Sequence, residues 1–301
     1  MSRDGFKAIV QRGVGGVSAA LSILGNRARG RLGILMYHRV APRTVGVPEP
    51  TMNVTPTSFR KQMLGLQRAG YCFVGLRDAL TRLEHGESLA ESSVIVTFDD
   101  GCQSVFTDAW PVLHELQIPA TIFINTAYLD SADPFPFDKW GVEHHRRLAP
   151  STYRPLTTAQ CREMQASGLV ELGAHTHTHA DFRGRPEALE ADLRQNLAEL
   201  AQRFGVDRPT FAFPFGRRHL GYVDDALIAV ARRAGVRCAL TTECELVDPA
   251  RDPFGWGRFN VYDWDSPRTL AARLRGWYDW APRWQGRIAE WRRGVQREAV
   301  S

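Results

Sequence analysis

Short apolar runs alternate with longer amphipathic segments along most of the chain. The runs at 32–38, 94–98, 120–124 and 169–174 have the length and composition of buried strands. Between them, apolar positions recur at steps of three and four residues, which predicts helices, and the longest helix is expected from about 186 to 204. Because strands and helices alternate, we expect an α/β fold with a parallel sheet and crossover helices.

The remaining elements follow the same pattern. Thr57 is expected to cap a helix that ends near Ala69, where Gly70 stops it. Further helices are expected over about 77–84, 104–116, 157–167 and 224–234, and further strands over 72–74, 211–216, 237–242 and 258–261. No repeat or low-complexity segment interrupts this order, which favours one large domain with terminal helices over two ordinary domains.

The strand at 94–98 ends in two adjacent carboxylates, Asp99 and Asp100, followed by Gly101. Two carboxylates side by side at the mouth of a buried strand repel each other, unless a cation lies between them or one takes a proton. This pair indicates a functional site. The alternative is a simple turn in which one aspartate caps the helix that begins near Ser104.

Histidines follow a second short apolar segment at alternate positions. His175, His177 and His179 are three of only nine histidines in the chain. Neutral imidazole is the most common metal ligand in proteins, and imidazole and carboxylate groups from different strand ends can converge on one divalent ion. A purely structural role for three histidines at one strand end is the weaker interpretation, so the sequence predicts a metal site.

Composition limits the class of protein and its partners. The 301 residues are 44% hydrophobic and 24% charged, as in a soluble globular protein. The net charge of +5 favours anionic surroundings such as lipid headgroups or phosphorylated glycans, but no nucleic-acid motif accompanies it, so nucleic acid is not expected as a partner. The five cysteines are widely spaced and form no C-x-x-C pair, which argues against a disulfide framework and favours a reducing, cytoplasmic location.

The two ends of the chain carry apolar patterns of their own. Residues 1–31 hold a weakly apolar run that is too short to span a bilayer and has no small-x-small cleavage site, so an amphipathic helix is expected. In 266–301, tryptophans recur on one helical stripe among arginines, at Trp277, Trp280, Trp284 and Trp291. Such a helix either packs on the domain or lies in an anionic membrane interface, and the second option would place the protein peripherally on the inner membrane face.

The segment from 127 to 156 is longer than an ordinary connection between a strand and a helix. It contains Asp138 and several aromatic residues, one of which is Trp140. A long loop at the strand ends can form a substrate wall, and exposed aromatic rings suit the apolar faces of sugars. A packed insertion without contact to a substrate is the equally weighted alternative.

The motifs Thr97-Phe98-Asp99-Asp100-Gly101 and His175-Thr176-x-x-His179 resemble those of the polysaccharide deacetylases, carbohydrate esterase family four. The resemblance covers roughly residues 32–265 and implies a distorted (β/α)7 barrel, with 1–31 and 266–301 as helical additions. It implies Asp99 as catalytic base and Asp100, His175 and His179 as ligands of a divalent metal. Zinc is the expected ion, with Co²⁺, Mn²⁺, Ni²⁺ or Fe²⁺ as alternatives, and His177 is not a ligand in this pattern.

The resemblance also implies the reaction. A metal-activated water, with Asp99 taking its proton, would remove N-acetyl groups from a GlcNAc-type glycan or a lipid-linked saccharide. The backbone amide of Phe215, beside Pro214, is nominated to stabilise the oxyanion. Two of the family's motifs are incomplete in this chain. The third motif, Ala212-Phe213-Pro214-Phe215, lacks the arginine of the family pattern, and the fifth motif lacks its histidine near Leu240.

The missing histidine has a candidate replacement. Within the family, the poly-N-acetylglucosamine deacetylases form a subgroup that looks permuted and supplies this histidine from the first strand. His38 matches that position, so the chain resembles this subgroup. His38 is therefore the expected general acid, against the alternative of a core histidine that closes a strand. The other functions left open are an O-acetyl esterase or cyclic amide hydrolase on the same scaffold, and a non-catalytic glycan-binding homologue. The intact Asp and His constellation argues against the last of these.

Overall fold

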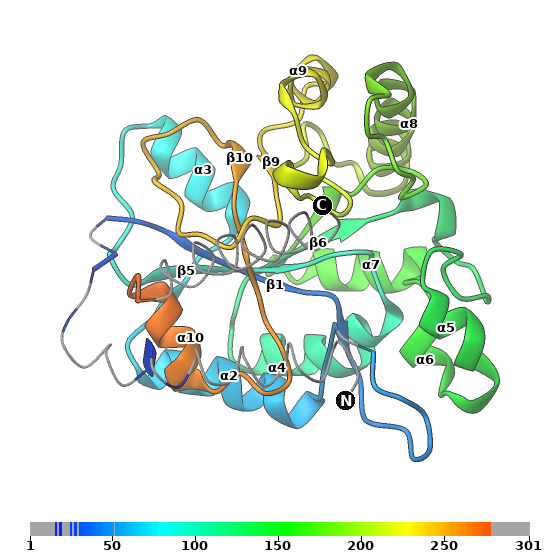
Figure 1. Ribbon diagram of the computed structural model, residues 1–301, viewed down its shortest axis with the longest axis horizontal. Coiled ribbons are helices and arrows are strands. Elements are labelled where there is room, and N and C mark those ends of the chain that lie inside the picture. Colours follow the sequence, from blue (N-terminus) through cyan, green and yellow to red (C-terminus); the bar gives the residue numbers. More distant parts are fainter. Residues whose placement is uncertain are drawn as a thin grey trace, which may run out of the picture.

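A curled parallel sheet forms the centre of the protein (Figure 1). The computed structural model describes residues 16, 18–19, 25, 27–28, 30–50 and 52–277. The strand order is β10-β9-β8-β7-β6-β5-β1-β11, and β4 pairs with β5 outside this order. The strands are β1 Gly33–Tyr37, β4 Cys72–Phe73, β5 Ser93–Phe98, β6 Ala120–Ile124, β7 Val170–Ala174, β8 Phe211–Ala212, β9 Ala239–Leu240, β10 Phe254–Trp256 and β11 Phe259–Asn260. This arrangement confirms the predicted α/β barrel class.

Helices cover the outer face of the sheet, and one helix packs against its inner face. The helices are α2 Pro56–Arg68, α3 Leu76–Glu84, α4 Trp110–Glu115, α5 Lys139–His144, α6 Pro150–Tyr153, α7 Thr158–Ala166, α8 Pro186–Phe204, α9 Asp225–Ala234 and α10 Pro267–Leu274. Leu76 and Leu80 of α3 pack in one buried cluster with Ile95 and Phe123, which point inward from β5 and β6. The barrel interior is therefore a packed core, and function is left to its ends.

Two helix boundaries differ from the sequence prediction. Thr55, not Thr57, caps α2, because its side chain accepts a hydrogen bond from Ser58 N and Pro56 occupies the first turn. The helix expected over 104–116 is divided into a π-helical turn, Val105–Ala109, and α4. Pro111 lies in the first turn of α4 and has no backbone N–H, so it cannot continue the α-helical hydrogen bonds of the preceding turn.

The start of the C-terminal region packs on the barrel. Arg273 of α10 forms a buried ion pair with Asp265 at 2.6 Å. Trp277 is 6% exposed, and its indole N–H donates to the carbonyl of Gly25 at 2.7 Å. Trp277, the first tryptophan of the stripe, therefore packs against the protein. The other three tryptophans of the stripe and most of residues 1–31 lie outside the described residues.

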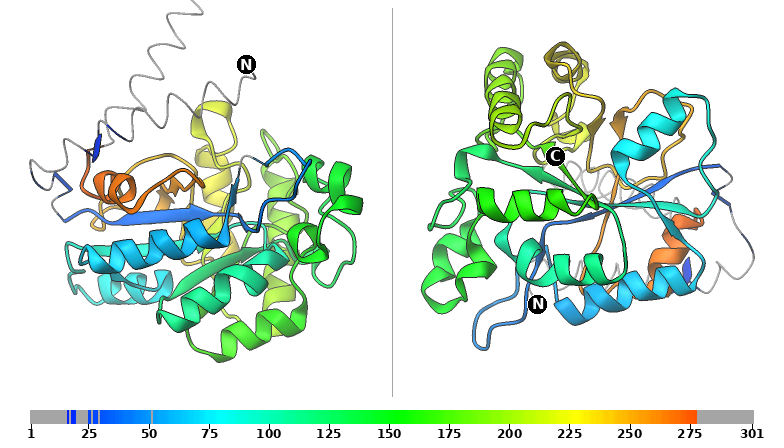
Figure 2. Two further views of the ribbon diagram at one scale, coloured as in Figure 1. Left: turned by 90° about the horizontal axis from the view of Figure 1, so that it is seen from below. Right: turned by 180° about the vertical axis from the view of Figure 1, so that it is seen from behind.

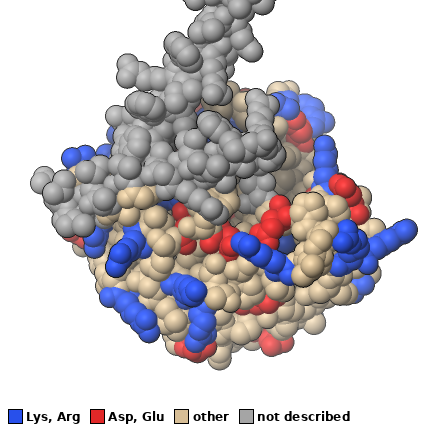
Figure 3. Space-filling view, turned by 60° about the horizontal axis from the view of Figure 1, so that its bottom comes forward, with Lys and Arg blue, Asp and Glu red and all other residues tan. Residues whose placement is uncertain are grey.

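Charges are mixed on the face shown in Figure 3, where basic and acidic side chains both occur across the described surface. Among the described residues, no helix has the length and the apolar character that a membrane crossing requires.

The loop of residues 41–50 lies beside α5 and α6 in the views of Figures 1 and 2. Val47 from this loop packs in a small cluster with Leu148, Tyr153 and Trp140. The loop begins after β2 Arg39–Val40, which pairs with β3 Asn53–Val54. The segment from 127 to 156, which we call the long insertion, thus packs against this loop and extends the strand-end face of the barrel.

Candidate active site

Two neighbouring parts of the sheet bring the predicted ligands together. Asp100 follows β5, while His175 and His179 follow β7, and β6 lies between these strands. Because all three strands are parallel, their carboxyl ends meet at one edge. The Asp100 Oδ1 lies 3.4 Å from His175 Nε2 and 3.5 Å from His179 Nε2. The three ligand atoms all lie within 4.8 Å of one another.

The chemistry of this triad fits a divalent metal ion. Asp100 Oδ1 is buried and has no hydrogen-bond partner among the described residues, which is costly unless a cation satisfies it. The Nδ1 of His175 lies 2.8 Å from the carbonyl of Ala212, so Nδ1 carries the proton and the Nε2 lone pair faces Asp100. Two imidazoles and one carboxylate form the three-ligand set that leaves a position open on zinc.

Electrostatics hold Asp100 and His179 in the forms that bind metal. Burial raises the pKa of Asp100, but its interactions with His175, His38 and His179 outweigh burial and lower that pKa far below its usual range. Burial lowers the pKa of His179 to about 4, so its imidazole is neutral. For His175, burial lowers the pKa, but the charges of Asp99 and Asp100 outweigh it and the pKa is raised.

The loops that carry these residues are strained. Asp100, Thr176, His179 and Phe215 have φ angles of 70°, 66°, 55° and 62°, in the left-handed region that non-glycine residues rarely adopt. Strain of this kind persists where the surrounding contacts hold it, and it gathers at functional sites.

Asp192 on α8 holds the histidine loop. One of its carboxylate oxygens accepts the backbone N–H of His177 at 2.5 Å, and the other accepts the hydroxyl of Thr178 at 2.5 Å. One turn further along the helix, the buried side chain of Asn196 donates to Thr126 Oγ1 at 2.9 Å. The Thr126 hydroxyl in turn lies 2.9 Å from His177 Nδ1, which fixes that ring away from the triad.

Replacing Asp192 with alanine should weaken metal binding by about 10- to 100-fold, because the loop loses the acceptors that hold its strained conformation. Competition with a metal-binding dye measures this. Asp192→Asn keeps one acceptor oxygen and should lose less. Glu190→Gln, on the same helix but on its exposed side, is the matched control and should bind metal as the wild type does. Equal metal affinity in Asp192→Ala and Glu190→Gln would rule out this role.

The predicted base, Asp99, lies against an arginine that the sequence motifs did not reveal. Arg258 donates two parallel hydrogen bonds to the Asp99 carboxylate at 2.6 and 2.7 Å, and the two side chains are 0% and 2% exposed. Burial raises the pKa of Asp99, but the charge of Arg258, followed by that of His175, outweighs it and lowers the pKa. Asp99 is therefore anionic at neutral pH.

Arg258 thus binds Asp99 in a chain whose third motif lacks an arginine. It also donates to the carbonyl of Thr241 at 3.0 Å, so the end of β9 holds it in place. The residue lies 159 positions from Asp99 in sequence. The sequence offered no local sign of this pairing beyond an arginine at the first position of the strand expected over 258–261.

His38 lies at the end of β1 on the same face. Its Nδ1 is buried without a hydrogen-bond partner among the described residues. His38 is among the groups that lower the pKa of both Asp99 and Asp100. His38 and Asp100 line one pocket of about 410 Å³.

Trp140 and Asp138 of the long insertion line this pocket as well. The Asp138 carboxylate is bound to Arg39 at 2.5 Å, and the Arg39 guanidinium lies 4.9 Å from the centre of the Trp140 ring. The indole N–H of Trp140 donates to the carbonyl of Pro48 at 2.6 Å. Asp138 is therefore occupied in holding the wall, and Trp140 is the residue of the pair that offers a ring face.

Phe215 borders the triad on another side. Its ring is 43% exposed and lies edge-on to His179, with ring centres 4.8 Å apart. Its carbonyl accepts the hydroxyl of Thr242 at 2.7 Å, whereas its N–H forms no backbone hydrogen bond with the described residues. Pro214 is buried, and its carbonyl accepts the N–H of Gly216 at 2.6 Å.

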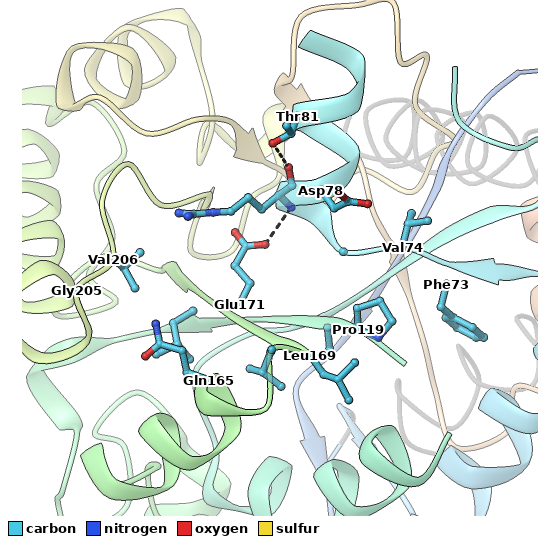
Figure 4. Close-up of a pocket in the computed structure, with 16 residues that line it drawn as sticks. Phe73, Val74, Asp78, Thr81, Pro119, Gln165, Leu169, Glu171, Gly205 and Val206 are labelled. Carbon is cyan, nitrogen blue, oxygen red and sulfur yellow. Dashed lines mark hydrogen bonds between the residues drawn. The ribbon is translucent and has the colours of Figure 1, made fainter. Parts of the chain in front are cut away.

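A larger pocket of about 700 Å³ lies elsewhere, near the amino ends of β6 and β7 (Figure 4). Glu171 points into this region and accepts hydrogen bonds from Arg77 N at 3.0 Å and Thr210 Oγ1 at 2.7 Å. Burial raises the pKa of Glu171. Its carboxylate is thus occupied in joining α3 to the barrel, and the pocket contains none of the predicted site residues.

Comparison with known proteins shows the family of this chain. A sequence model of the polysaccharide deacetylase family matches residues 86–239, about half of the chain. YxkH of Bacillus subtilis is 26% identical over 214 residues, which cover 71% of this chain and 65% of YxkH. The poly-beta-1,6-N-acetyl-D-glucosamine N-deacetylase of Staphylococcus aureus is 24% identical over 236 residues, which cover 75% of this chain and 73% of that enzyme.

Solved structures share the fold. IcaB from Ammonifex degensii is 26% identical, with a TM-score of 0.66 over 83% of this chain and 98% of IcaB. The Streptococcus pyogenes deacetylase PplD, in complex with acetate, is 22% identical, with a TM-score of 0.67 over 81% of this chain and 98% of PplD. The chain belongs to the polysaccharide deacetylase family, as its motifs suggested. Its homologues indicate an enzyme that acts on the acetyl groups of polysaccharides.

Proposed function

We propose that this protein is a metal-dependent hydrolase that removes N-acetyl groups from a GlcNAc-type glycan. The observation that carries the proposal is the anionic Asp99, held by Arg258 directly beside the triad of Asp100, His175 and His179. The triad would hold a divalent ion, zinc in our proposal, which supplies Lewis-acid activation of water and of the acetyl carbonyl.

The side chains around the triad have separate tasks. Arg258 binds both oxygens of Asp99, which keeps the carboxylate ionised and oriented to take a proton from the attacking water. The backbone N–H of Phe215 is the donor that we assign to the developing oxyanion. His38 would give a proton to the departing amine, because that amine is a poor leaving group without one.

The nature of the substrate rests on the pocket and on the relatives. A pocket of about 410 Å³ with an aromatic wall suits one sugar unit and its acetyl group. The name of the Staphylococcus aureus relative gives it a polymer of N-acetylglucosamine as substrate, which supports the same class here. We extend the proposal to lipid-linked saccharides and to a cytoplasmic enzyme at the inner membrane face, because the chain is basic and rich in arginine.

Mass spectrometry of candidate glycans tests the proposal. Metal-loaded protein incubated with N-acetylglucosamine oligomers should lower their mass by one acetyl group for each deacetylation and release acetate. Release of acetate from O-acetylated glycans tested in parallel would identify an O-acetyl esterase. Hydrolysis of a cyclic amide would identify a cyclic amide hydrolase. Binding of oligomers without release of acetate would instead identify a glycan-binding homologue.

Replacing His38 with alanine should lower kcat by about 10²- to 10⁴-fold if it protonates the amine. The metal content should stay near that of the wild type, because His38 is not one of the three ligands. Steady-state kinetics with elemental analysis of the same sample measure both. A substrate with a good leaving group, such as an activated acetyl ester, should lose much less rate. An unchanged kcat on the glycan would show that another group is the general acid.

A further inference from the structure

The ring of Phe215 is exposed although the ring two residues before it is not. Phe213 is 2% exposed, whereas Phe215 is 43% exposed. Phe215 and Gly216 both adopt left-handed backbone angles, with φ of 62° and 60°, which turn the Phe215 ring out of the core. A strained backbone that presents an apolar ring to solvent beside the triad requires an explanation.

A stack of side chains supports this ring from behind. The ring of Tyr222 lies 4.7 Å from that of Phe215 at an interplanar angle of 34°. The guanidinium of Arg183 lies 4.3 Å from the centre of the Tyr222 ring. Asp181 holds Arg183 through hydrogen bonds of 2.6 and 3.0 Å. Each contact favours one orientation of the next group, so the Phe215 ring is a fixed surface.

Phe215 does not line the pocket with Trp140, but both contact His179. Phe137, which lines that pocket, stacks on His179 at 4.0 Å, and Phe215 contacts the same imidazole at 4.8 Å. His179 therefore contacts both a wall of the pocket and the Phe215 ring. A chain-like substrate with one unit in the pocket would continue across His179 toward this ring.

We propose that Phe215 is a stacking platform for a sugar unit next to the one that is deacetylated, with Tyr222 and Arg183 as positioning residues. The inference rests on the proposed function. The carbohydrate class follows from the surface, because the apolar face of a pyranose presents C–H groups to the electron-rich ring face. An acyl chain would instead need a continuous apolar groove.

The test compares oligomers of N-acetylglucosamine by length. Tyr222→Ala should raise KM for the hexamer about 5- to 10-fold and leave the kinetics of the N-acetylglucosamine monosaccharide unchanged, since only a chain with a neighbouring unit reaches the platform. Tyr222→Phe keeps the ring and should restore the wild-type KM. Arg183→Gln, an exposed change that spares the core, should raise the hexamer KM by a smaller factor. Leu220→Ala removes another exposed apolar side chain of the same turn and should change nothing.

The outcomes separate this inference from the proposed function. If the wild type deacetylates the oligomers and Tyr222→Ala leaves the hexamer KM unchanged, the platform is wrong and the function stands. If the wild type leaves every oligomer intact, the proposed function fails, and calorimetric titration then gives the hexamer Kd directly. In that case a Kd that rises in Tyr222→Ala but not in Leu220→Ala supports the platform, and equal values overturn it.

Discussion

Replacing Asp99 with asparagine should lower kcat by about 10²- to 10⁴-fold, the range typical of a lost general base. The amide cannot take a proton from water, while its size and position are kept. Metal content should remain near one ion per chain, because Asp99 is not among the three ligands. Steady-state kinetics and elemental analysis of the purified variant measure the two quantities.

The same variant should also be less stable. Arg258 is fully buried and would keep its charge without a carboxylate partner, which costs about 3–5 kcal/mol when one member of a buried pair is removed. The kinetic result therefore needs a control for stability. Asp265→Asn provides it, because Asp265 forms the other strongly buried pair described above, with Arg273 at 2.6 Å.

Asp265→Asn should lower the free energy of unfolding by a similar amount and leave kcat near the wild-type value. Thermal unfolding followed by circular dichroism gives the stability of both variants. If Asp99→Asn is folded, holds metal and keeps more than about a tenth of the wild-type kcat, a different group is the base.

Replacing His175 with alanine should abolish stoichiometric metal binding and, with it, activity. The residue supplies one of three ligands, and its Nε2 faces Asp100 because Ala212 holds the other ring nitrogen. The loss in affinity should exceed the 10- to 100-fold that is typical for residues that only support a ligand. Elemental analysis after dialysis measures the metal that remains.

His177→Ala is the matched control, two residues away in the same loop. Its ring lies against Thr126 and outside the triad, so the variant should retain most of the metal. A second readout is independent of activity, since added zinc should raise the thermal midpoint of the wild type and of His177→Ala, but not of His175→Ala. Full metal occupancy in His175→Ala would contradict the assigned ligand set.

The sequence by itself determined the local parts of this protein. Apolar runs and helical periodicity predicted most strands and helices, because these patterns record which face of a segment is buried. The Asp99-Asp100 pair and the spacing from His175 to His179 could be recognised because each motif lies within one strand end. From parallel strands it also followed that these ends share one edge of the sheet, which the structure bears out for Asp100 and both histidines.

Only the tertiary structure decided which distant side chains complete the site. Arg258 reaches Asp99 because β11 pairs with β1, and β1 pairs with β5. This register places Arg258 below the strand end, and its side chain extends to Thr97 and Asp99, 159 positions away from it in sequence. Asp192 likewise reaches the histidine loop from α8, and Asp138 reaches Arg39 from the long insertion. Hydropathy carries no information on such pairings, because they depend on strand order and helix packing and not on local periodicity.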